Sequence, residues 1–164
     1  MILALFAAFA LDGAILPPAA SPTTAAAAAS PAPQALDPAT IKAIEATIHD
    51  YVDGQLEGDP ARVRRSLHPD LAKRAVRSKP DPDEALGLRR MSRDELVELT
   101  RQGALKTPRD QWDRSVRVLD ITENVASARL ETPWFVDYFH LGRFGERWVI
   151  VNALWFPKPQ PPAK

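Results

Sequence analysis

The stretch TPWFVDYFHLGRFGERWVIVNALWFP, Thr132–Pro157, decides how the chain folds. Two aromatic-rich runs flank Gly145 and Glu146, and glycine at such a place is typical of a β-hairpin turn because it tolerates positive φ. If these two residues form the turn, Phe144 lies opposite Arg147. Successive side chains then point to alternate faces of the sheet.

This register assigns the side chains of the hairpin to two faces. One face carries Phe135, Asp137, Phe139, Leu141 and Arg143 opposite Trp148, Ile150, Asn152 and Leu154. The other carries Trp134, Val136, Tyr138, His140 and Phe144 opposite Val149, Val151, Ala153 and Trp155. Both faces are mainly apolar, whereas a hairpin with one solvent-exposed face alternates apolar and polar residues. We therefore expect helices on one face and a second sheet or subunit on the other; a slip of one residue would exchange every assignment.

The composition excludes several classes of site. The chain has 164 residues, a formal net charge of zero and no cysteine. This length fits one folded domain, and the balanced charge gives no reason to expect a nucleic-acid partner. Without cysteine there are no disulfides, thiolate nucleophiles or cysteine metal sites. Three histidines without paired spacing give no metal signature, and no motif indicates a cofactor.

The first 36 residues are not expected to belong to the fold. Residues 1–20 are apolar and rich in small residues, which is typical of a signal peptide. Residues 21–36 form an alanine- and proline-rich stretch that is predicted to be a disordered linker. We expect a secreted or periplasmic protein with no membrane span in its mature form; the alternative is a cytoplasmic protein with a disordered extension. Residues 158–164 are predicted to be a disordered tail.

The folded domain is predicted to span residues 37–157 and to begin with helices. An Asp-Pro pair opens a helix at residue 37 and another at residue 59, because aspartate caps a helix and proline fits its first turn. Gly58 ends the first helix, and His68-Pro69 ends the second. A third helix is predicted over residues 91–102, where Ser92 and Glu95 form a capping box.

The remainder is predicted to be mainly β-structure. Residues 71–76 fit either a short strand or a helical turn. Alternating residues predict strands over 115–121 and 125–132, followed by the hairpin. The expected architecture is therefore α+β, with helices on one face of a four-stranded antiparallel meander.

Several separate motifs resemble one known superfamily. IEATIHDYVDGQLEGD, LHPDLAKR, MSRDELVELTR and ETPWFVDYFHLGRFGERWVIVNALW are similar to the nuclear transport factor 2-like (SnoaL-like) superfamily, and within it to the putative lumazine-binding group. The resemblance implies a cystatin-like cone, with three N-terminal helices packed on a curved antiparallel β-sheet. It also implies a ligand pocket at the open end and a homodimer through the outer face. The superfamily hosts isomerases, dehydratases, polyketide cyclases and binding modules, so no single activity follows.

One face of the hairpin is the candidate pocket wall. Asp137 and Asn152 lie on this face beside Trp148 in the register above. A carboxylate on an apolar wall could act as a general base near neutral pH. The alternative is that Asp137 forms a structural salt bridge with Arg143 or Arg147, since buried carboxylates are usually paired.

Three residues outside the hairpin are further candidates. Tyr51 lies on the apolar stripe of the first helix and could offer its hydroxyl to a ligand, or could be a core aromatic. His68 could transfer a proton or bind a ligand, or could cap helical carbonyls. Arg74 could anchor a phosphate or carboxylate, or could be solvated.

The other face of the hairpin is the candidate dimer interface, with Trp134, Tyr138, His140 and Trp155. The leading hypothesis is an exported, homodimeric protein that binds a small organic molecule of unknown identity. The alternatives are an isomerase or dehydratase that uses Asp137 or His68 as its base, and a dimerisation module without a ligand.

Overall fold

The computed structural model describes residues 37–76 and 87–159. The predicted signal peptide and linker, residues 77–86, and residues 160–164 of the tail lie outside these ranges.

Three α-helices and one short 3-10 helix form in the described part: α1 (Pro38–Glu57), α2 (Pro60–Ser66), α3 (Arg93–Arg101) and η1 (Arg109–Gln111). The side chains of Asp37 and Asp59 cap α1 and α2 as predicted. Gly58 ends α1 with a φ of 77°, a conformation that glycine adopts without strain. Ser92 and Glu95 form the predicted capping box of α3.

The six described strands form one mixed sheet: β1 (Leu67–Val76), β2 (Leu88–Met91), β3 (Ser115–Thr122), β4 (Val125–Glu131), β5 (Phe135–Phe144) and β6 (Arg147–Pro157). Their order is β2-β1-β6-β5-β4-β3. The predicted meander of β3 to β6 is present, but β1 adds parallel to β6, so the prediction of an entirely antiparallel sheet was wrong. The helices are also not all N-terminal, because α3 follows β2. His68-Pro69 lies in β1 and does not end α2.

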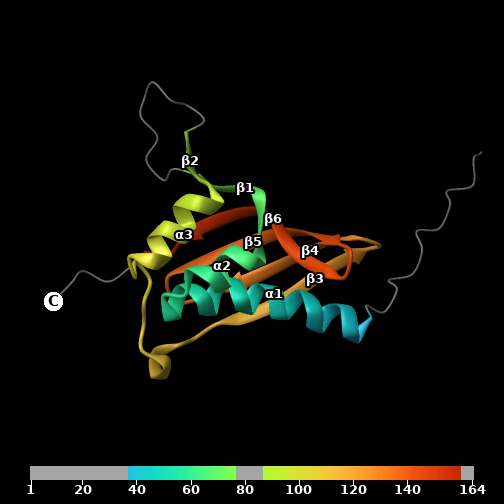
Figure 1. Ribbon diagram of the computed structural model, residues 1–164, viewed down its shortest axis with the longest axis horizontal. Helices are drawn as coiled ribbons and strands as arrows, with labels where there is room; N and C mark the ends of the chain where they lie inside the picture. Colours follow the sequence, from blue (N-terminus) through green and yellow to red (C-terminus); the bar gives the residue numbers. More distant parts are fainter. Residues whose placement is uncertain (1–36, 77–86, 160–164) are drawn as a thin grey trace, which may run out of the picture. The chain divides into compact units, whose positions relative to one another are not determined.

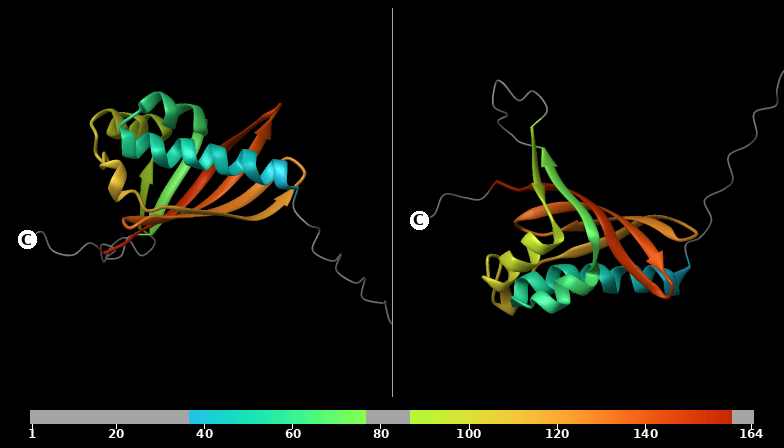
Figure 2. Two further views of the ribbon diagram at one scale, coloured as in Figure 1. Left: turned by 90° about the horizontal axis from the view of Figure 1, so that it is seen from below. Right: turned by 45° about the horizontal axis from the view of Figure 1, so that its top comes forward.

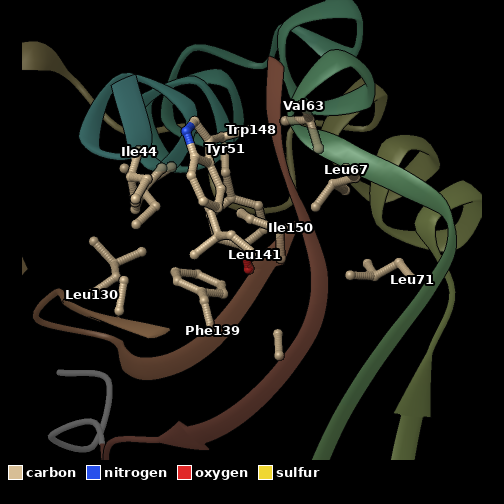
Figure 3. Packing of buried hydrophobic residues seen from close by; sticks show 14 of the residues in the cluster. Ile44, Tyr51, Val63, Leu67, Leu71, Leu130, Phe139, Leu141, Trp148 and Ile150 are labelled. Carbon is tan, nitrogen blue, oxygen red and sulfur yellow. The ribbon is translucent and has the colours of Figure 1, made fainter. Parts of the chain in front are cut away.

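The helices lie over one face of the sheet (Figures 1 and 2). The core forms between α1 and this inner face. Tyr51 of α1 meets the ring of Phe139 edge-on, with centroids 5.2 Å apart. Figure 3 shows Leu141, Trp148 and Ile150 packed beside the Tyr51 and Phe139 rings. The sheet is therefore positioned against α1 by large apolar side chains from β5 and β6.

The hairpin turns where the sequence predicts, with Phe144 opposite Arg147. However, the register shifts between His140 and Leu141 of β5. Ile150 pairs with Leu141 and Asn152 pairs with His140, so Val151 is an extra residue in β6. Such a β-bulge places two residues of one strand against one of its partner.

The bulge corrects the predicted faces of β6. Beyond Val151, the alternation of side chains is displaced by one residue. Ala153 and Trp155 are buried on the inner face, with exposed fractions of 3% and 8%. Asn152 and Leu154, which were predicted to face inward, are exposed. The prediction was therefore right near the turn and wrong for the second half of β6.

The outer face carries exposed apolar side chains. Tyr138, Leu154 and Phe156 are each about half exposed, at 50%, 51% and 55%. Within the described residues, the helices do not cover this face (Figure 2). No helix of the described part is both long and apolar enough to cross a membrane.

Candidate functional site

Three polar side chains meet in the interior of the domain. The Nζ of Lys73 lies 2.5 Å from Asp137 Oδ1 and donates to the Tyr51 hydroxyl at 2.9 Å. The Tyr51 hydroxyl donates to the second carboxylate oxygen, Asp137 Oδ2, at 2.8 Å. The Asp137 side chain is fully buried, and that of Lys73 is 6% exposed. This Tyr51–Asp137–Lys73 network is closed, because each member is bonded to both others.

Each member comes from an element whose local pattern turns it inward. Tyr51 follows Ile44 and Ile48 on the buried stripe of α1. Asp137 shares the inward face of β5 with Phe139 and Leu141, and Lys73 shares that of β1 with Leu71 and Ala75.

The parallel pairing of β1 with β6 makes the ion pair possible. β6 lies between β1 and β5, so the Lys73 side chain extends across one strand to reach Asp137. The residue paired with Lys73 on that strand is Ala153, whose methyl group leaves room for the crossing. The bulge at Val151 therefore contributes to the network, because it turns Ala153 inward.

Burial shapes the acid–base properties of the network. It raises the pKa of the Tyr51 phenol well above its usual value, and the Asp137 carboxylate acts in the same direction. It lowers the pKa of Lys73, against the opposing effect of Asp137. Arg89 adds a smaller lowering of the Lys73 pKa by charge repulsion. Tyr51 thus remains a hydrogen-bond donor at neutral pH.

A cavity of about 250 Å³ adjoins this network. Its apolar lining comes from β2, α3 with its following turn, and the ends of the hairpin strands: Met91, Leu96, Leu99, Ala104, Leu105, Phe135 and Trp155. Its polar lining consists of Tyr51, Gln55, Lys73, Arg89 and Thr100. An apolar enclosure with a few convergent polar groups is the usual construction of a small-molecule site.

Aromatic rings surround the Lys73 ammonium. Its Nζ lies 4.9 Å from the ring centroid of Trp155, 5.5 Å from that of Tyr51 and 5.8 Å from that of Phe135. The guanidinium of Arg89 also lies 4.9 Å from the Trp155 centroid. Trp155 therefore contacts both cations of the cavity, and such contacts stabilise a cation by electrostatic attraction to the ring.

The predicted pocket residues do not all meet at this cavity. Tyr51 lines it, and Asp137 lies behind it, bonded to Tyr51 and Lys73. The partner expected for Asp137 was Arg143 or Arg147; the observed partner is Lys73, and Arg147 instead donates to the backbone carbonyl of Arg65.

The other predicted pocket residues lie elsewhere. Trp148 is a core residue, and its carbonyl accepts a hydrogen bond from Thr47. His68 stacks on Phe144 with centroids 5.2 Å apart and accepts the backbone N–H of Asp70. Neither residue lines the cavity.

Arg74 and Asn152 also lie away from the cavity. Arg74 alternates with the inward-facing Lys73 and pairs in register with the outward-facing Leu154. Asn152 is exposed and pairs with His140 on the outer face. The predicted approach of Asn152 to Asp137 is therefore wrong, because the bulge separates the two residues onto opposite faces.

Of the residues predicted for a dimer interface, two lie exposed on the outer face. These are Tyr138 and His140. Trp134 is half-buried against the core. Trp155 is on the inner face and lines the cavity, so its predicted place was wrong.

Sequence reasoning missed Lys73 and Arg89. The signal for Lys73 was the alternation of Leu71, Lys73 and Ala75, which places a lysine on the apolar face of a strand. No comparable signal marks Arg89, because its neighbour Arg90 has the same chemistry but does not line the cavity. In the described part of the chain, no three His, Asp or Glu side chains gather as a metal site would require.

Comparison with protein families gives one match. The profile described as "Putative lumazine-binding" matches residues 39–156. The comparison with curated proteins gave no match.

Solved structures share the fold at low sequence identity. An NTF2-like protein of unknown function from Shewanella baltica is 21% identical, with a TM-score of 0.62 over 74% of this chain and 96% of that one. Another, from Silicibacter pomeroyi, is 16% identical, with a TM-score of 0.61 over 73% and 97%. A putative scytalone dehydratase from Novosphingobium aromaticivorans is 12% identical, with a TM-score of 0.51 over 74% and 85%. These likenesses establish the cone fold but no activity.

Proposed function

This chain belongs to the "Putative lumazine-binding" family of the NTF2-like superfamily, and we propose that it binds a small organic molecule in the cavity beside Trp155. The observation that carries the proposal is the lining of this cavity, in which apolar and aromatic side chains surround the polar groups of Tyr51, Lys73 and Arg89. The volume of about 250 Å³ lies just below the usual range for drug-sized ligands, so the ligand is compact.

The closed network supports binding over catalysis by Asp137. Both oxygens of Asp137 are already bonded, to Tyr51 and Lys73, and the carboxylate does not line the cavity. A general base must reach the substrate proton within hydrogen-bonding distance. His68 is likewise absent from the lining. The dehydratase among the structural neighbours is too distant in sequence to supply an activity by analogy.

A neutral aromatic probe tests the proposal. We expect naphthamide to bind the full chain saturably, as measured by calorimetry and by quenching of tryptophan fluorescence. The variant Ala104→Trp places an indole at the rim of the cavity and is expected to weaken binding at least about tenfold by excluding the probe. Ala46→Trp is the matched control, because Ala46 is an exposed residue of α1 outside the lining.

Two results would count against binding in this cavity. One is the absence of saturable binding to the wild-type protein. The other is equal affinity of the two tryptophan variants, which would locate the probe elsewhere. Unchanged far-ultraviolet circular dichroism of both variants would establish that the comparison concerns folded proteins.

The exposed outer face supports a second proposal, a homodimer through β5 and β6. Tyr138, Leu154 and Phe156 form an apolar strip there, and exposed apolar strips of this kind often mark interfaces. Light scattering over a range of concentrations should then give a dimer mass, and Tyr138→Glu should give a monomer. A monomer mass for the wild-type protein at high concentration would refute the dimer.

Export is also a proposal, and it is based on residues 1–20. We expect the protein isolated from cells to begin after this stretch. Mass spectrometry that finds Met1 on the cytoplasmic protein would refute it.

A further inference from the structure

The lining of the cavity has an excess of positive charge. Lys73 and Arg89 both contribute to it, and no aspartate or glutamate of the described residues does. Asp137, behind the lining, compensates one of these charges through its contact with Lys73. The second charge, on Arg89, is joined by no ion pair to a carboxylate of the described residues.

Two described acids that lie near Arg89 are bonded to other residues. Glu95 and Glu98 of α3 border a surface hollow that Arg89 also lines. The Glu95 carboxylate accepts hydrogen bonds from the backbone and side chain of Ser92. The Glu98 carboxylate accepts from Arg101 and Gln102. Within residues 37–76 and 87–159, no carboxylate therefore competes for the Arg89 guanidinium, which can bind an added anion.

The contact with Trp155 orients Arg89 for such an anion. A guanidinium stacked on an aromatic ring keeps the N–H groups of its edge free, and these groups match the two oxygens of a carboxylate. Lys73 adds a further donor, because an ammonium has three N–H groups and the network uses two of them. Both donors belong to the wall of one cavity.

We propose that the ligand of this cavity is a compact aromatic carboxylate, whose anionic group binds Arg89 and Lys73 and whose ring packs against Trp155 and Phe135. This inference rests on the proposed binding function and specifies its chemical class. An anion beside Lys73 offsets the repulsion from Arg89, so binding raises the pKa of Lys73 and is accompanied by proton uptake in alkaline solution.

Two probes of similar shape distinguish the contribution of the ligand's negative charge from that of its aromatic ring. Naphthoate and naphthamide have nearly the same shape, but only naphthoate carries a negative charge at neutral pH. Calorimetry on the full chain is expected to give an affinity for naphthoate at least about tenfold higher than that for naphthamide, because hydrogen bonds to charged groups contribute more than neutral ones.

Substitution of Arg89 tests where the charge is bound. Arg89→Gln is expected to weaken naphthoate binding about tenfold or more and so to abolish the preference for naphthoate over naphthamide. Arg90→Gln is the control, because Arg90 is the next residue of β2, exposed and outside the lining of this cavity. Both arginines are exposed, so neither change is expected to affect folding.

The outcomes distinguish the two proposals. Equal affinities for naphthoate and naphthamide, or equal weakening by Arg89→Gln and Arg90→Gln, would overturn the carboxylate inference and leave the binding function standing. No binding of either probe would overturn both. Preference for naphthoate, lost in Arg89→Gln and retained in Arg90→Gln, would support both.

Discussion

Replacing Lys73 by Met removes the cation from a buried ion pair while keeping a side chain of similar length. Asp137 is fully buried and, among the described residues, would retain the Tyr51 hydroxyl alone as a side-chain partner. Removing one partner of a buried pair leaves an uncompensated charge, which typically costs about 3–5 kcal/mol. For a domain of this size, each kcal/mol lowers the melting temperature by about 4 °C, so we expect a decrease of roughly 12–20 °C.

A double-mutant cycle identifies the cause of this loss. Asp137→Asn removes the charge that Lys73 compensates, so the double variant should be destabilised by at least about 2 kcal/mol less than the sum of the two single changes. Urea denaturation followed by circular dichroism measures each unfolding free energy, and unchanged m-values would validate the comparison.

Arg74→Met is the matched control for this cycle. Arg74 is the neighbouring cation on β1 and points to the other face, so its loss is expected to cost within about 0.5 kcal/mol. Additive effects of the Lys73 and Asp137 changes, or an equal cost at Arg74, would refute the account of the network.

The bulge in β6, the Tyr51 phenol and the ion pairs of Asp53 each allow a further test. Deleting Val151 should remove the bulge, turn Trp155 outward and prevent stable folding, whereas Val151→Ala should retain a cooperative unfolding transition. Native-like stability of the deletion variant in urea would contradict the structural role of the bulge. The Tyr51 phenol ionises near its ordinary pKa of 10.0 in the unfolded chain but stays protonated in the folded protein. Folding stability should therefore fall above pH 10 by up to about 1.4 kcal/mol per pH unit, and Tyr51→Phe should lack this decrease. Parallel stability profiles of the wild-type protein and Tyr51→Phe above pH 10 would contradict this role of Tyr51. Asp53 is buried and forms ion pairs with Arg62 and Arg114, which are both partly exposed. Asp53→Ala should therefore cost about 1.5–3 kcal/mol in urea denaturation, the usual range for hydrogen bonds to charged groups. An effect below about 0.5 kcal/mol would contradict a structural role.

Local sequence signals predicted the N-terminal caps of the three α-helices, the end of α1 and the hairpin turn. Asp37, Asp59 and the Ser92–Glu95 box act within a few residues of their own position, so their effect is visible in the sequence. Gly145 likewise determines the turn through its own backbone, with a φ of 62°. These features could be predicted because their physical cause is local.

The bulge could not be predicted in the same way. Val151 lies in a continuous apolar run without glycine or proline, and nothing near it marks an extra residue. Its cause is tertiary, because Trp155 is buried and Ala153 admits Lys73 only if the alternation of β6 is displaced. The predicted assignment of β6 side chains to the two sheet faces was therefore correct up to Ile150. Beyond Val151 the two faces were exchanged.

The Lys73 contact was also beyond local reasoning. Lys73 and Asp137 are 64 residues apart, and their approach depends on the parallel pairing of β1 with β6. The sequence left residues 71–76 undecided between strand and helical turn, so the strand that carries Lys73 was not included in the predicted sheet. Asp137 was correctly singled out as a buried carboxylate, but its partner was not.

Binding of a small molecule beside Trp155 is the proposed function of the cavity. The most direct test is a titration of the ¹⁵N-labelled protein with naphthamide, followed through the indole N–H resonances of its four tryptophans. Only Trp155 lines the cavity, so its resonance is expected to shift saturably while those of Trp112, Trp134 and Trp148 move little. An unchanged Trp155 resonance at saturating probe, or larger shifts of the other three indole resonances, would contradict binding beside Trp155.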